Sequence, residues 1–250
     1  TVLDLSKLRG GAAALPERYV RRGEETLVRI EKEESALRAT RRAVRLFGKS
    51  DAASPRGGVG RVICGDAGWS CAGAGAGLLL QAAACITGVD QKLIDQLPDT
   101  DGIPNEILIY KDHQTNYTRC YRGAGAKIVT YGDEGGTTDE QLEAALGPKT
   151  AALAYVFHPW NSCPLTLEQA VDVAHARDIP VIVDAAVMLP PVSSLTSYIK
   201  QGADLVTFSG GKGLRGPQST GILCGKTDLI KAAQLNMSPN HGIGRPAKVC

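Results

Sequence analysis

From about residue 104 onward, the chain alternates short apolar runs, rich in β-branched residues, with longer segments of helical period. Such alternation is typical of βα units, which build a mostly parallel sheet with helices on both faces. We therefore predict an α/β fold for this part of the chain. The expected strands cover residues 106–110, 127–131, 151–157, 180–183, 205–208 and 221–224, and the expected helices cover residues 117–123, 138–145, 167–177 and 193–201.

The part of the chain before residue 104 is less regular. Residues 75–87 are apolar nearly all round, which predicts a buried helix. Residues 24–47 have helical composition with many charged positions, and residues 49–62 are rich in Gly, Ser, Pro and Arg, which indicates a loop. We expect an N-terminal helical segment and loop over residues 1–60, followed by one large domain over residues 61–250.

The composition of the chain indicates which kinds of binding partner are to be expected. A net charge of +2, with no Lys/Arg run longer than two residues, argues against nucleic acid. No apolar stretch has the length of a transmembrane helix, so we expect no membrane partner. The seven cysteines are an odd number without CxxC pairs, and most lie in apolar runs. They indicate free thiols in a reducing compartment, which favours the cytoplasm and no metal site.

Ligands of an open parallel sheet bind outside the carboxyl ends of its strands. Asp184 directly follows the apolar run at 179–183. A carboxylate at this position needs a partner, because burial of an unpaired charge is costly. Asp184 is either a helix N-cap or strand-end turn residue, or the partner of a cationic ring nitrogen in a cofactor.

Lys212 follows the next apolar run and is flanked by Gly211 and Gly213, where the backbone can approach a ligand closely. The alternative is an ordinary solvated lysine. A lysine partly desolvated near a cationic ring has a lowered pKa, as Schiff-base chemistry requires. Ser209, three residues earlier, could donate its hydroxyl to a phosphate.

Gly73 and Ala74 open the apolar helix within a run of small residues. Small residues at a helix N-terminus let backbone N–H groups reach an anion such as phosphate. The run lacks the spacing of a dinucleotide-binding fingerprint, because position 78 is Leu.

Three further residues have ordinary and functional interpretations. His113 follows the strand at 106–110, so it is either a loop histidine or a group that stacks on a cofactor or moves a proton. Arg215 and Gln218 lie in the turn after Lys212. An arginine in this turn could hold a carboxylate or phosphate by a two-pronged contact.

Taken together, residues 180–186 and 202–221 resemble the selenocysteine-synthase-like group of fold-type-I pyridoxal-phosphate (PLP) enzymes. That group includes L-seryl-tRNA(Sec) selenium transferase and D-glucosaminate-6-phosphate ammonia-lyase. The match runs from about residue 86 to 249 and includes residues 97–105 and 242–246. It implies a fold-type-I PLP-dependent transferase large domain, with a mostly parallel seven-stranded sheet between helices.

The resemblance also implies a role for each candidate. Lys212 forms the Schiff base with PLP, Asp184 pairs with the pyridine nitrogen, His113 stacks on the ring, and Ser209, Gly73 and Ala74 hold the phosphate. Arg215, Gln218 and Arg245 are the candidates for substrate binding. Two departures stand out: residues 71–74 read Cys-Ala-Gly-Ala where the family usually has Thr-Ser-Gly-Ala, and the sequence stops at Cys250, near the expected start of the family's small C-terminal domain.

The reaction implied is PLP-dependent elimination on an amino acid or amino sugar acid, begun by α-proton abstraction, as in the ammonia-lyase branch. Selenium transfer, transamination and racemisation on the same scaffold remain alternatives, as does a non-catalytic PLP-binding or scaffolding role. We expect a homodimer or higher homo-oligomer, because fold-type-I sites form at subunit interfaces. Another chain could supply the C-terminal domain.

Overall fold

The computed structural model describes residues 66–133, 136–159, 163–237 and 239–247, together with Ser35 and Arg38. Apart from those two residues, the helical segment and loop expected over residues 1–60 lie outside the described residues.

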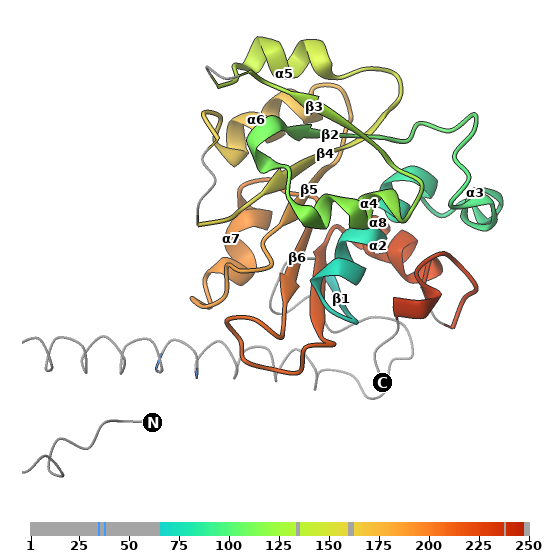
Figure 1. Cartoon of the computed structure of the whole chain (residues 1–250), viewed down its shortest axis with the longest axis vertical. Coiled ribbons are helices and arrows are strands. Elements are labelled where there is room, and N and C mark those ends of the chain that lie inside the picture. Colours follow the sequence, from blue (N-terminus) through green and yellow to red (C-terminus); the bar gives the residue numbers. More distant parts are fainter. Residues whose placement is uncertain are drawn as a thin grey trace, which may run out of the picture.

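The fold is built on a seven-stranded sheet with the order β1-β7-β6-β5-β4-β2-β3. The five strands from β6 to β3 run parallel, and β7 runs antiparallel to both β6 and β1. Figure 1 shows this order from β3 at the top to β1 at the bottom. The mostly parallel α/β sheet is thus confirmed. The strands are β1 (Ala67–Cys71), β2 (Glu106–Tyr110), β3 (Lys127–Tyr131), β4 (Thr150–Val156), β5 (Val181–Asp184), β6 (Leu205–Ser209) and β7 (Gly221–Gly225).

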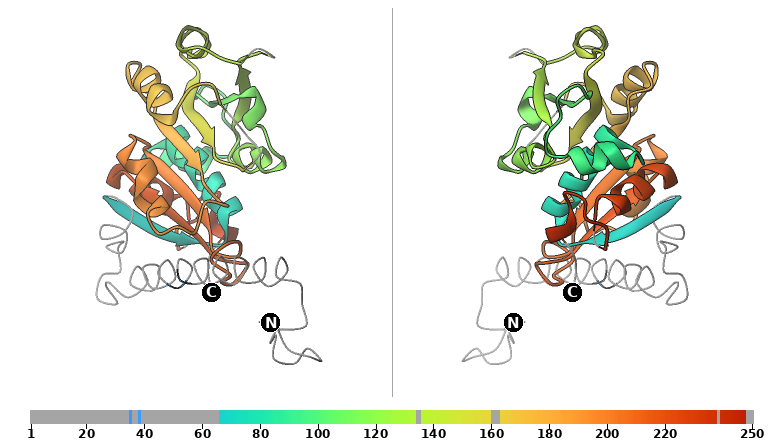
Figure 2. Two further views of the ribbon diagram at one scale, coloured as in Figure 1. Left: turned by 90° about the vertical axis from the view of Figure 1, so that its left-hand side faces the viewer. Right: turned by 90° about the vertical axis from the view of Figure 1, so that its right-hand side faces the viewer.

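Helices cover both faces of the sheet (Figures 1 and 2). One core cluster joins the sheet to α5, α6 and α7, and the other joins it to α2, α4 and α8. The central strands send alternate side chains to the two clusters, as the pleat requires, whereas the clustered side chains of β1 all lie on the α2 side. The helices are α2 (Ala74–Thr87), α3 (Gln91–Gln96), α4 (Arg119–Arg122), α5 (Asp139–Ala145), α6 (Leu167–His175), α7 (Ser194–Lys200) and α8 (Thr227–Leu235).

Helix α2 packs unusually close to the sheet. A Cβ on Gly77 would lie 2.5 Å from Cγ2 of Thr207 on β6, so only glycine fits at this contact. Elsewhere, local sequence fixes the helix starts: Thr138 with Gln141 and Thr166 with Gln169 form capping boxes at the N-termini of α5 and α6. Within the described part of the chain, no helix is long and apolar enough to cross a bilayer.

Three elements were not predicted: β1, α3 and α8. The sequence of β1 is Ala-Gly-Trp-Ser-Cys, which has no β-branched residue, and its register comes entirely from pairing with β7. The single helix expected over residues 117–123 is instead a 3-10 turn (Asn116–Thr118) followed by α4. The five described cysteines are free thiols, in line with the expectation of no disulfide framework; they are residues 71, 85, 120, 163 and 224.

Candidate active site

A cavity of about 590 Å³ opens at the carboxyl edge of the parallel strands. Its walls come from the ends of β4 and β5, the loop after β2 and the loop between β6 and β7. Asp184, Lys212, His158 and Tyr117 are among the lining residues. The structure therefore brings the predicted aspartate and lysine together at the edge where open α/β sheets bind ligands.

Asp184 is the last residue of β5 and is 7% exposed. Its Oδ1 accepts a hydrogen bond of 3.0 Å from the backbone N–H of Ala186. Burial raises the pKa of this carboxyl, while the Ala186 N–H, Lys212 and His158 oppose the shift. The carboxylate thus faces the cavity in surroundings that favour a cationic partner.

Lys212 lies in the loop between β6 and β7, with its Nζ 5.0 Å from the centroid of the Tyr117 ring. A cation at this distance over a tyrosine ring is attracted by the ring's electrons. A Cβ on Gly213 would lie 1.9 Å from the carbonyl oxygen of Leu189, so this glycine lets the loop pack closely. Lys212 is exposed and lines the cavity, and its partial desolvation beside a cationic ring stays a prediction.

Gly73 is the N-cap of α2, with φ at +98°. The first amide N–H groups of α2 have no carbonyl one turn earlier, which leaves them free for an anion. A Cβ on Gly221 would lie 2.6 Å from the carbonyl carbon of Gly73, and Gly221 pairs in register with Ser209. The structure therefore brings Gly73, Ala74 and Ser209 to the same corner of the sheet.

His113 does not line this cavity. It is 2% exposed, and its ring lies edge-on to Tyr110 and Tyr155 at centroid distances of 5.3 and 4.6 Å. Its Nδ1 accepts a 3.4 Å hydrogen bond from the N–H of Val156. Burial lowers the pKa of this imidazole to about 4, with Asp112 opposing the shift. The cofactor-stacking role of His113 stays a prediction.

His158 and Tyr117 line the cavity but were not among the predicted site residues. His158 follows β4 by two residues, so its place after an apolar run was the signal that could have found it. Tyr117 gave no such signal. It reaches the cavity because the chain turns back through the 3-10 turns after β2.

The three predicted substrate-binding residues lie outside the cavity lining. Arg215 is exposed with φ at +51°, and its N–H donates to the carbonyl of Lys212. Gln218 Nε2 donates to the carbonyl of Gly211 at 3.1 Å. Arg245 is exposed and donates to the carbonyl of Pro239 at 3.1 Å. Their substrate-binding roles remain predictions.

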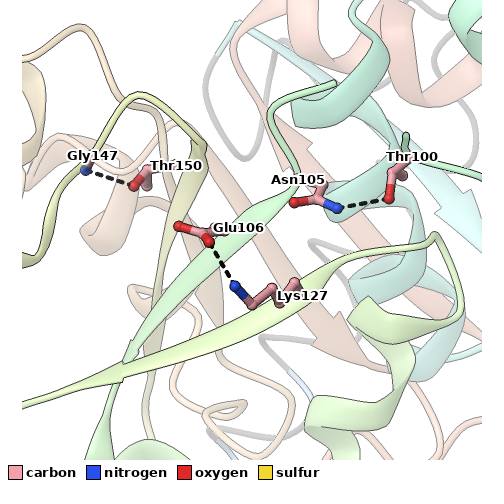
Figure 3. A network of polar contacts seen from close by, with 6 residues as sticks. All are labelled: Thr100, Asn105, Glu106, Lys127, Gly147 and Thr150. Carbon is pink, nitrogen blue, oxygen red and sulfur yellow. Dashed lines mark hydrogen bonds and ion pairs between the residues drawn. The ribbon is translucent and has the colours of Figure 1, made fainter. Parts of the chain in front are cut away.

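A second cavity, of about 750 Å³, lies at the opposite edge of the sheet, where β2 and β3 begin. Its polar groups contact each other, as Figure 3 shows. Lys127 Nζ lies 3.0 Å from Glu106 Oε1, and Asn105 Nδ2 donates to Thr100 Oγ1 at 2.7 Å. Because these groups are already paired, this larger hollow is the weaker candidate for a reactive site.

The fold and the carboxyl-edge site together define an α/β protein of the kind that holds a small charged cofactor at its strand ends. Comparison with known proteins gives the family: the sequence pattern of aminotransferase class-V matches residues 101–242. The chain belongs to this family.

Individual relatives are longer than this chain. A D-glucosaminate-6-phosphate ammonia lyase of Salmonella typhimurium is 33% identical over 221 residues, which is 85% of this chain and 58% of that protein. A 5'-C-glycyluridine monooxygenase-decarboxylase of a Streptomyces species is 35% identical over 185 residues, or 71% and 44% of the two chains. A solved structure of D-glucosaminate-6-phosphate ammonia-lyase superposes with a TM-score of 0.70 at 30% identity, covering 86% of this chain and 58% of that chain.

Proposed function

We propose that this chain forms the PLP-binding part of a lyase that acts on an amino acid or amino sugar acid by α-proton abstraction and elimination. One observation carries the proposal: a buried carboxylate, Asp184, and a glycine-flanked lysine, Lys212, share one cavity. The similarity to D-glucosaminate-6-phosphate ammonia lyase supports elimination as the reaction.

Residues that line the cavity suit the ring nitrogen and the aldehyde of PLP, and the N-terminus of α2, outside that lining, suits the phosphate. A pyridinium nitrogen suits Asp184, whose pKa is raised by burial and which therefore favours a cationic partner. A phosphate suits the N-terminus of α2, where the first backbone N–H groups of the helix begin at Ala74, while the N–H of the N-cap Gly73 donates to the carbonyl of Cys71 at 2.8 Å. The aldehyde suits Lys212, which lines the same cavity as Asp184.

When bound, PLP would supply an electron-withdrawing ring that takes up the negative charge left by proton removal. Asp184 would hold a proton on the ring nitrogen and keep the ring cationic. The amine of Lys212 would accept the α-proton of the substrate. Ser209 and the α2 N-terminus would hold the phosphate and fix the orientation of the ring.

We propose further that the protein works as a homo-oligomer in the cytoplasm. Free cysteines support a reducing compartment, as the described thiols show no disulfide. The substrate is a small molecule in this proposal, and a partner chain or further domain would contribute the remaining wall of the site.

Absorbance spectroscopy of the purified protein with PLP tests the proposal. We expect a band near the visible edge that shifts when amino acids or amino sugar acids are added, together with release of ammonia and a keto acid. A band that never shifts would favour a non-catalytic PLP-binding role. Keto-acid formation without ammonia would favour transamination, and the absence of any band would exclude PLP.

A further inference from the structure

Gln81 Oε1 and Thr207 Oγ1, between α2 and the sheet, are among the buried polar atoms that have no hydrogen-bond partner in the described part of the chain. Both residues are 0% exposed. Buried polar atoms in folded proteins nearly always bond to protein or to ordered water. These atoms therefore mark a place where a small polar molecule belongs.

Gln81 and Thr207 both adjoin the peptide that carries Asp184. Gln81 Nε2 donates a 3.1 Å hydrogen bond to the carbonyl of Val183, the residue directly before Asp184. Thr207 is the register partner of Asp184 on the neighbouring parallel strand, and its carbonyl accepts from the N–H of Ala185 at 3.0 Å. Register partners send their side chains to the same face of a sheet, so Thr207 and Asp184 share the α2 face.

Gly77 brings these two side chains into the same layer. A Cβ built on Gly77 would lie 2.8 Å from Thr207 Oγ1, so this hydroxyl touches the helix. Gln81 lies one turn further along α2, on the same side of the helix as Gly77. Both unpartnered oxygens therefore lie between α2 and the β5–β6 pair, beside Asp184.

The side chains of Gln81, Thr207 and Asp184 need one more molecule to complete their hydrogen bonds. The amide oxygen of Gln81 and the carboxylate of Asp184 only accept, whereas the hydroxyl of Thr207 can donate a single proton. One water molecule completes the set by accepting from Thr207 and donating to Gln81 and Asp184. We propose that Gln81 and Thr207 hold a buried water that donates to Asp184, which makes both of them positioning residues for this carboxylate.

Other groups also act on Asp184. Lys212 and His158 favour its charged form, and Cys120 and Tyr121 of α4 lie within electrostatic reach. An additional hydrogen bond from water favours the charged form further. Loss of that water therefore makes Asp184 harder to ionise, and the consequence for cofactor binding rests on the proposed function.

The experiment compares Thr207→Val, which keeps the side-chain shape and removes the hydroxyl, with Thr207→Ser, which restores it. Thr87→Val is the matched control, because Thr87 is 3% exposed at the other end of α2 and bonds to Ala83 and Asn236. The titration of Asp184 is followed by carboxyl ¹³C NMR of the cofactor-free protein, with the signal assigned from Asp184→Asn. The dissociation constant for PLP is measured separately.

Thr207→Val should move the Asp184 titration to higher pH and weaken PLP binding roughly tenfold. Thr207→Ser and Thr87→Val should stay close to the parent in both measurements. The inference is overturned if Asp184 titrates in Thr207→Val as in the parent, or if Thr87→Val shifts it equally. Gln81→Leu should repeat the shift, and it replaces Thr207→Val if that variant does not fold. A shifted titration in a protein that binds no PLP would support the water site and contradict the proposed function.

Discussion

Two buried aspartates at neighbouring strands, Asp204 and Asp184, each have a lysine and a histidine nearby, but their carboxylates differ in how far these side chains contact them. Asp204, 1% exposed, directly precedes β6. Its Oδ1 lies 2.5 Å from Lys226 Nζ, and its Oδ2 lies 2.8 Å from His175 Nε2 and 2.6 Å from the N–H of Val181. The hydrogen bond from Lys226 Nζ to the Asp204 carboxylate raises the pKa of the Lys226 ammonium. Both carboxylate oxygens of Asp204 are thus in direct contact with partners inside the protein.

Asp184 also has a lysine and a histidine nearby, Lys212 and His158, but the three line a cavity. Within the described part of the chain, its carboxylate accepts a hydrogen bond from the N–H of Ala186. The same three residue types thus form a closed structural cluster where they touch, and a candidate reactive site where they line a cavity that could hold a ligand. The volume of a cavity alone does not distinguish a structural site from a candidate reactive one. The larger cavity, at the amino edge of the sheet, contains the ion pair between Lys127 and Glu106, which is already formed.

Replacing Lys212 and Lys226 by alanine, each in its own variant, should show the largest difference between the two aspartate sites. We expect Lys212→Ala to abolish covalent attachment of PLP, because the reactive amine is gone, with little change in thermal stability. Lys226→Ala should retain attachment and lower the melting temperature, because Asp204 loses its ion pair. Borohydride reduction followed by peptide mapping detects the attachment. A label at another lysine in the parent protein would disprove the assignment of Lys212.

Asparagine at each aspartate gives the second test. Asp184→Asn should keep PLP bound and lower turnover by about 3–5 kcal/mol, a hundredfold or more, because an amide does not hold the ring nitrogen protonated. Asp204→Asn should instead lower the free energy of unfolding by about 3 kcal/mol. Steady-state kinetics and urea denaturation measure the two effects. Near-normal turnover in Asp184→Asn would contradict the comparison.

A third test uses His113, a histidine that is not part of the group around Asp204 or the group around Asp184, and follows stability as a function of pH. Its pKa of about 4 lies below the ordinary 6.5, so the unfolded chain binds the proton more tightly. Stability present above pH 6.5 should therefore fall as the pH drops toward 4, by roughly 3 kcal/mol. Urea denaturation at several pH values gives the free energy of unfolding as a function of pH. This dependence on pH should be less steep for His113→Phe than for the parent. The control is His241→Gln, at an exposed histidine, which should keep the dependence of the parent.

Cofactor retention gives the smallest expected effect. If the resemblance places His113 against the PLP ring correctly, His113→Ala should weaken PLP binding tenfold at most, since ring stacking contributes about 0.5–1.5 kcal/mol. His113→Phe should restore that binding. Unchanged PLP affinity in His113→Ala would place this imidazole in the aromatic core with Tyr110 and Tyr155 alone.

The sheet, and the placing of Asp184 and Lys212 at the carboxyl ends of its strands, could be predicted from the sequence because both rest on local patterns: apolar runs and the residues that follow them. The place of His158 in the cavity lining, and the burial of His113 among aromatic rings, could not be predicted, because the direction of a loop depends on distant contacts. The 3-10 turn after β2 points His113 inward, where Val156 donates to its ring. No local pattern contains that contact.

The pairing of β1 with β7 has a consequence for the order of folding. Cys71 pairs with Gly221, which lies 150 residues further along the chain. Closing so long a loop is entropically costly, and such distant contacts form slowly. The turn at Gly73 contacts Gly221, so the N-terminal end of α2 acquires its final shape only after the last strand has docked. During synthesis, a chain that has not yet added β7 has most of its parallel sheet, but the proposed phosphate site is incomplete.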